Sequence, residues 1–271
     1  MAINKKVNLN FHQTFPPDAA HISALLSLAK SQEAYTKEEI SDITGIPTGK
    51  SSGKVEPSIR YAEYMGLVQD EVKDKKHLLR LTPLGEEILY QDEMLQEKAT
   101  LYLCHSGLVS DSGASLWNCI FSMLIPRYGA ALKTVTLKDA LKNYYNGVDV
   151  NMAPVISSYN GMFKKLSILK NSQDEIKFNY QAFKDAYYYI YVYMFLKEWE
   201  TMYLGAQELT ADDVYSMNIE YKLCLTRVDF DRVLTIMDSE GIIKIERLLN
   251  PFVVLKLHTS QEIIKKIYSR I

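Results

Sequence analysis

The feature that most constrains the fold is a short pattern that occurs three times, at residues 64–68, 165–169 and 239–243. At each place the end of a helical stretch is followed by a glycine or serine and then by two aliphatic residues that begin an extended run. Repetition of one supersecondary unit along a chain indicates tandem copies of one architecture. We therefore expect three units, with approximate bounds of 1–90, 91–182 and 183–271.

The first unit is best defined in residues 36–89. Thr36 and Glu39 have the spacing of a capping box, which predicts a short helix that begins after Thr36 and ends at Gly45. A second helix is expected beyond a polar loop, because apolar residues recur there at helical spacing. These residues are Val55, Ile59, Ala62 and Met65.

Two extended runs follow, at residues 67–68 and 78–81, and the charged turn 73–76 joins them into a hairpin. A further helix is expected to start after Thr82, with a proline at its first position. Residues 19–30 supply the preceding helix. Helix, turn, helix and hairpin in this order predict a winged helix-turn-helix unit.

The second and third units have the same order in less regular form. Second-unit helices are expected at 114–124, 136–142 and 153–166, before a hairpin at 168–178. In the third unit, residues 186–204 are apolar on almost every side, which predicts the buried central helix of the protein. Its other helices are expected at 211–217, 226–238 and 260–271, with a hairpin at 241–257. The expected fold is mainly α with small β-hairpins (α+β): tandem winged helix-turn-helix units around a central buried helix.

Composition narrows the choice of partners. The hydrophobic content of 47% and the charged content of 24% are ordinary for a globular chain of 271 residues. The formal net charge of −2 is unlike that of a general nucleic-acid binder, so any DNA contact must come from a local basic patch. Three widely spaced cysteines without metal-ligand spacing predict buried thiols in a reducing cytoplasm. The longest apolar run, residues 186–196, is too short to cross a bilayer, so we expect no membrane association.

Polar and basic residues of the first unit form the predicted DNA-binding surface. A helix can present donors to a major groove, while lysines in a hairpin can reach phosphates. A loop that precedes a helix N-terminus also suits a phosphate. The predicted contacts are Lys54, Ser58 and Arg60 for the groove, Lys50, Ser51 and Ser52 for the DNA backbone, and Lys73, Lys75 and Lys76 for the flanking phosphates.

No arrangement of residues predicts catalysis, a cofactor or a metal site. Residues 45–51 resemble a phosphate-binding loop, but they are one residue short and follow a helix rather than a buried strand. The histidines are scattered, and His12 and His105 are expected to be structural because their surroundings are apolar or aromatic. The tyrosine-rich stretch 187–193 surrounds a whole helix, which favours packing over base stacking. We therefore predict a protein that is not an enzyme.

A set of short motifs stands in order in the first half of the chain. They lie at 11–16, 53–54, 58–61, 65–67, 82–85, 99–105 and 108–110, followed by Trp117 and Phe121. As a set they resemble an uncharacterised prokaryotic family, the domain of unknown function 4007 (DUF4007). The resemblance implies a DNA-binding accessory protein whose genes lie beside sulfur-transfer, DNA-phosphorothioation or other phage-defence genes. It implies no catalytic residues, and residues 91–97 depart from the acidic-aromatic pattern of the family.

The leading hypothesis is a cytoplasmic winged-helix protein that binds double-stranded DNA. It would serve as an accessory or regulatory protein of a bacterial DNA-modification or phage-defence system, with DNA-modification or sulfur-transfer proteins as further partners. The alternative is a protein–protein adaptor that docks such an enzyme without contacting DNA, because one fold can host several functions.

Overall fold

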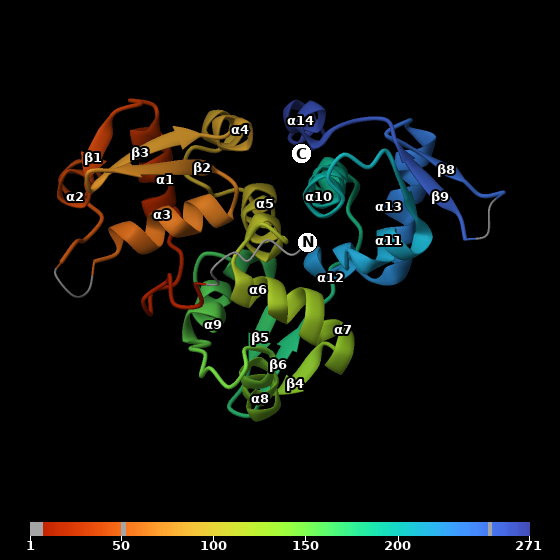
Figure 1. The fold of residues 1–271 in the computed structure, drawn as a ribbon, viewed down its shortest axis with the longest axis horizontal. Helices are drawn as coiled ribbons and strands as arrows, with labels where there is room; N and C mark the ends of the chain where they lie inside the picture. The colour runs from red at the N-terminus through yellow and green to blue at the C-terminus, as the bar shows by residue number, and fades with distance from the viewer. Residues whose placement is uncertain (1–7, 50–52, 249–250) are drawn as a thin grey trace.

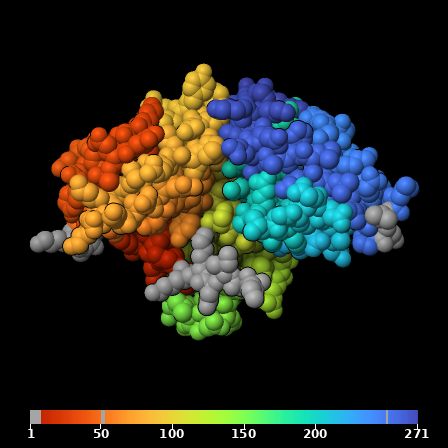
Figure 2. All heavy atoms as spheres, turned by 45° about the horizontal axis from the view of Figure 1, so that its top comes forward, coloured from red at the N-terminus to blue at the C-terminus, as the bar shows by residue number. Residues whose placement is uncertain are grey.

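The computed structural model describes residues 8–49, 53–248 and 251–271, and the same order of elements occurs in it three times (Figure 1). Each time a helix is followed by a short strand, by further helices and by an antiparallel hairpin. The fold is α+β, with small antiparallel sheets. Figure 2 shows the first unit in orange and the third in blue as adjoining lobes, with the green second unit below them.

The first unit packs helices against a three-stranded sheet. Its elements are α1 (Ala19–Ala29), β1 (Ala34–Thr36), α2 (Lys37–Thr44), α3 (Val55–Tyr64), β2 (Val68–Lys73) and β3 (Lys76–Leu81). Strand β3 lies between β1 and β2. The predicted capping box is confirmed, since Glu39 N donates to the Thr36 hydroxyl (3.2 Å) and Thr36 N donates to the Glu39 carboxylate (2.7 Å). Gly45 ends α2 in the left-handed conformation, as predicted.

The second unit is less regular than the first. Its elements are α6 (Ser115–Cys119), the π-helical turn η1 (Ile120–Leu124), α7 (Ile125–Tyr128), β4 (Ala131–Lys133), α8 (Thr134–Tyr144), α9 (Ala153–Asn160), the 3₁₀ turn η2 (Lys164–Leu166), β5 (Leu169–Asn171) and β6 (Glu175–Phe178). Strand β6 lies between β4 and β5. The helix predicted at 153–166 ends early, because Phe163 N turns back to donate to the Ser158 carbonyl (2.9 Å).

The third unit begins with the helix that was predicted at 186–204. Its elements are the 3₁₀ turn η3 (Asp185–Tyr187), α10 (Tyr188–Met202), β7 (Glu208–Thr210), α11 (Ala211–Ser216), α12 (Ile219–Lys222), α13 (Arg227–Ser239), β8 (Ile243–Glu246) and β9 (Val253–Lys256), with α14 (Ser260–Ile263) and the turn η4 (Ile264–Lys266) at the end. Strand β9 lies between β7 and β8. The predicted closing helix at 260–271 is therefore too long.

One other expectation, about the sheets, is wrong. The sequence predicted a two-stranded hairpin in each unit, whereas β1, β4 and β7 each add a third strand of three residues. Residues 9–14 form turns, in which Gln13 and Thr14 have positive φ angles of 51° and 106°.

Helix α5 (Lys98–Val109) lies at the centre of the molecule and contacts all three units (Figure 1). It follows α4 (Pro83–Gln91), which ends at Asp92. Gly107 lies so close to α3 that a Cβ would overlap the Met65 carbonyl oxygen. His105 Nε2–H donates to the Lys222 carbonyl (3.1 Å), which leaves Nδ1 to accept from the Tyr159 hydroxyl (2.9 Å). This one side chain therefore joins α5 to α12 and to α9.

A buried ion pair lies beside that contact. The Lys222 ammonium donates to the carboxylate of Glu198 on α10, and both side chains are almost fully enclosed. The Asp111 amide also donates to Glu198 (3.1 Å). Burial raises the pKa of Glu198, although Lys222 and the amide act in the opposite direction. Each charge needs the other, because an unpaired buried charge is costly.

Other expectations about the interior are confirmed. Cys104, Cys119 and Cys224 are buried, and the tyrosines of α10 pack inward, with Tyr188 and Tyr191 enclosed. Among the described residues, no helix combines the length and apolar character needed to cross a membrane.

His105 gives the protein a defined acid sensitivity. Burial lowers its pKa from 6.5 to about 3, so the unfolded chain binds more protons between these pH values. The stabilisation from neutral His105 is complete above about pH 6.5 and is lost as the pH falls towards 3. We expect the wild-type free energy of unfolding to fall over this range more steeply than that of His105→Gln, by up to about 1 kcal/mol per pH unit. Urea unfolding at a series of pH values measures both slopes, and parallel slopes would contradict the assignment.

Candidate nucleic-acid interface

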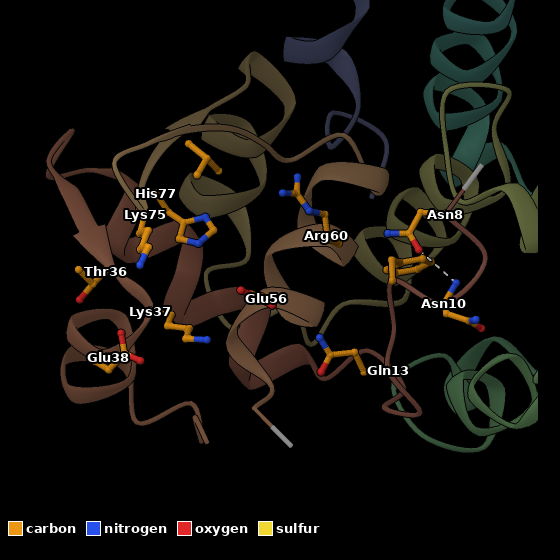
Figure 3. A pocket seen from close by; sticks show the side chains of 12 residues that line it. Asn8, Asn10, Gln13, Thr36, Lys37, Glu38, Glu56, Arg60, Lys75 and His77 are labelled. Atoms are coloured by element: carbon orange, nitrogen blue, oxygen red, sulfur yellow. Dashed lines mark hydrogen bonds between the residues drawn. The ribbon is translucent and has the colours of Figure 1, made fainter. Parts of the chain in front are cut away.

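A polar groove of about 810 Å³ runs across the exposed side of α3 in the first unit (Figure 3). Four segments line it: the N-terminal turns, the start of α2, α3 and the β2–β3 hairpin. The residues that line it are Asn8, Asn10, Phe11, Gln13, Thr36, Lys37, Glu38, Glu56, Arg60, Val72, Lys75 and His77. Cations and carboxylates both face this space, so its charge is mixed.

A network of charged side chains fixes the hairpin against α3. Arg60 pairs with Glu63 one turn along and lies 3.4 Å from the Asp70 carboxylate. The Asp70 side chain is fully buried, and its carboxylate lies 2.9 Å from His77 Nδ1. The Asp70 amide donates to Glu63 (3.2 Å). The arrangement holds β2 and β3 at a set position relative to the groove.

The third unit has a matching contact at the same spacing. There the Ile245 amide on β8 donates to the carboxylate of Asp238 on α13 (2.9 Å). The two residues are seven positions apart, which is also the separation of Asp70 and Glu63. The helix ends agree as well, since Leu67 N donates to the Ala62 carbonyl and Ile242 N to the Met237 carbonyl, both at 2.9 Å. The first and third units therefore share the joint between helix and hairpin.

The hairpin turn of the first unit gathers three exposed lysines. Asp74 and Lys75 have φ angles of 52° and 63°, which is the two-residue type I′ turn that matches strand twist. Lys73 and Lys76 flank it and are directly opposite each other across β2 and β3. All three predicted hairpin lysines are exposed, in agreement with the sequence prediction.

The other predicted contacts do not form one surface. Lys50, Ser51 and Ser52 lie outside the described residues. Ser58 is buried, with 6% of its surface exposed, so the prediction that it faces DNA is wrong. Lys54 lies on the same side of α3 as Ser58, in a small pocket apart from the groove, and its Nζ is 5.3 Å from the centre of the Phe15 ring.

The N-terminal segment covers the side of α3 that carries Lys54 and Ser58. Tyr61 donates its hydroxyl to the Phe15 carbonyl (2.9 Å), and this draws residues 15–18 over the helix. The groove side instead carries Glu56, Arg60 and Glu63 at helical spacing. That i, i+4, i+7 pattern was the available signal that Arg60 belongs to a different face from Lys54.

The described residues hold no group of three or more histidine, cysteine or acidic side chains that could bind a metal ion.

The chain is thus an α+β protein of three repeated helix-and-hairpin units with a polar groove on the first. No protein-family model matches it, and no curated protein matches its sequence. Two solved structures share the fold: magnesium ion-bound SspB, with a TM-score of 0.75, and SspB, with a TM-score of 0.73. Each is 13% identical in sequence, over 96% of this chain and 88% of the SspB chain. At this identity the likeness shows a common fold alone.

We expect Asp70→Asn to lower the free energy of unfolding by about 1–3 kcal/mol. The asparagine side chain has no charge to pair with Arg60 and one acceptor oxygen instead of two beside His77. The matched control is Glu71→Gln, the same change one residue further on at an exposed position, which should cost less than about 0.5 kcal/mol. Chemical denaturation measures both, and equal effects would show that the network does not hold the hairpin.

Proposed function

We propose that the chain is a winged-helix DNA-binding accessory protein of a bacterial DNA-modification or phage-defence system, without an enzymatic activity of its own. The topology supports this, because each unit has a strand, helices and a hairpin in the order of a winged helix. The resemblance of the first half to the DUF4007 family supplies the link to DNA modification. The fold shared with SspB is compatible with it.

One observation carries the DNA-binding part: two of the three hairpins place lysines directly opposite each other. The pairs are Lys73 with Lys76 in the first unit and Lys170 with Lys177 in the second. Like charges at such positions destabilise a sheet. All four side chains are exposed, and a polyanion at these hairpins would remove the repulsion.

The charge of the second unit also supports DNA binding. Residues 125–178 contain eight lysines and arginines but four aspartates and glutamates, although the whole chain has a net charge of −2. The basic patch that DNA binding requires therefore includes the β5–β6 hairpin as well as the β2–β3 hairpin. The proposed contacts are with phosphates, which position a protein on DNA without reading sequence.

The face of α3 favours a second candidate function. Glu56 and Glu63 flank Arg60 there, and Arg60 is already paired with Glu63 and Asp70. Carboxylates on this face would repel a phosphate backbone but suit a protein partner with lysines or arginines. The groove would then dock a modification or sulfur-transfer protein, as the adaptor alternative requires.

The hairpin lysines provide the direct test of DNA binding. We expect the Lys73→Ala/Lys75→Ala/Lys76→Ala variant to bind duplex DNA at least tenfold more weakly in fluorescence anisotropy. The slope of log K against log salt should become shallower by about 0.9 for each phosphate that the variant no longer neutralises. The control removes three exposed lysines of the third unit, Lys197, Lys244 and Lys266. Equal affinity of both variants would exclude the β2–β3 hairpin, and no binding by wild-type protein at low salt would favour the adaptor.

The second hairpin allows loss of binding to be separated from loss of folding. We expect Lys170→Glu to weaken DNA binding while it raises the free energy of unfolding by about 0.2–1 kcal/mol, because an attractive cross-strand pair replaces a repulsive one. Anisotropy and thermal unfolding of the same preparation measure the two effects. Unchanged affinity in the stabilised variant would remove this hairpin from the interface.

A further inference from the structure

A second, smaller cavity lies far along the chain from the groove, where three segments meet. It has a volume of about 140 Å³ and shares no lining residue with the groove. The start of α5 forms one wall, residues 165–167 form the second, and residues 181–187 before α10 form the third. The cavity thus depends on the packing of the second and third units against α5.

Each wall contributes a lysine. Lys98, Lys165 and Lys184 line the cavity, and no acidic residue is among its described lining residues. Within the described part of the chain, none of the three belongs to a salt bridge; Lys165 donates instead to the Gln96 carbonyl (2.9 Å). The acidic neighbour of Lys184, Asp185, is paired with Arg270 (3.0 Å). Among the described residues the three lysines therefore have no acidic partner, although Lys184 Nζ lies 5.2 Å from the centre of the Tyr187 ring.

Tyrosines complete the polar and aromatic surface of the cavity. The Tyr102 hydroxyl donates to the Leu223 carbonyl and is occupied. The Tyr191 hydroxyl accepts from the Lys184 amide (3.3 Å), so its own proton remains available to donate. The rings of Tyr102 and Tyr187 lie 5.7 Å apart and give the cavity an aromatic wall.

The backbone adds to the positive potential. Helix α5 begins at this cavity, and its preceding residue, Glu97, makes no side-chain capping bond to the first amides. Unfilled amides at the start of a helix favour an anion. The volume is below the roughly 300 Å³ of a pocket for a drug-sized ligand, which suits a phosphate with one attached group rather than a large cofactor.

We infer that this cavity binds a phosphate monoester. The lysines neutralise its charge, Tyr191 donates a hydrogen bond to an oxygen, and the aromatic wall contacts the attached nucleoside. A mononucleotide and the 5′-phosphorylated end of a DNA strand both present this group. The inference does not rest on the proposed contacts of the hairpins with duplex DNA.

The test is calorimetric titration of the full chain with four probes: adenosine 5′-monophosphate, adenosine, and a short oligonucleotide with and without a 5′-phosphate. We expect each probe with a terminal phosphate to bind more tightly than its counterpart without one, because either oligonucleotide can also contact the hairpin lysines through its backbone phosphates. Such a preference for the mononucleotide alone identifies a free nucleotide as the ligand, and a preference for the 5′-phosphorylated oligonucleotide identifies a strand end. Absence of a preference in both pairs of probes overturns the inference.

Variants assign the binding to this cavity. Lys98→Ala/Lys184→Ala removes two exposed charges and should weaken binding of the phosphorylated probe at least tenfold. Tyr191→Phe keeps the buried ring and removes the donor, so it should weaken binding several-fold. The control Lys197→Ala/Lys244→Ala removes as many charges elsewhere and should bind as wild type does. Thermal unfolding verifies that each variant is folded, and wild-type affinity in the Lys98/Lys184 variant overturns the inference.

Discussion

The arrangement of the three units depends on Lys222, whose two ends bind two different helices. Its carbonyl accepts a hydrogen bond from His105 on α5, and its ammonium pairs with Glu198 on α10. The surroundings exclude water, so neither group has an alternative partner there, and both bonds must form together for the interior to close. A buried network of this kind adds little stability compared with an apolar core of the same volume. However, all of its members are satisfied in only one arrangement of the helices. Here that arrangement sets α5 between the units.

Because α5 contacts every unit, its position determines which surfaces can act together. Gly107 brings it against the end of α3, the helix to which the Arg60–Asp70 network attaches the first hairpin. His105 ties it to Tyr159 on α9, the helix that packs against strand β5 of the second unit's hairpin. Helix α5 therefore sets the position of the two lysine-bearing hairpins relative to each other. The same helix begins at the small cationic cavity, so that site also exists only when the units are assembled.

Features that depend on neighbouring residues could be predicted from the sequence. Features that depend on segments far apart in the chain could not. The capping box at Thr36 and the hairpin lysines were predictable, since each is settled within a few residues. The strands β1, β4 and β7 have three residues each, too few to show alternation, and they become strands only by pairing with a hairpin. Burial of Ser58 could not be read from α3 itself, because the segment that covers it lies some forty residues earlier. The three lysines of the small cavity are similarly separated in sequence.

The charge distribution limits the ways in which the proposed DNA contact could form. In a winged helix that reads bases, the exposed helix enters the major groove and directs hydrogen-bond donors at the base edges. Here Glu56 and Glu63 occupy that face, and Arg60 is held between carboxylates, so insertion would bring acids close to phosphates. Lysines of the β2–β3 and β5–β6 hairpins, by contrast, belong to no salt bridge within the described part of the chain. DNA contact through the hairpins alone, as proposed, would give salt-sensitive binding with little dependence on base sequence. Such binding would fit the proposed accessory role, in which the hairpins hold DNA and a partner docks at the mixed-charge groove.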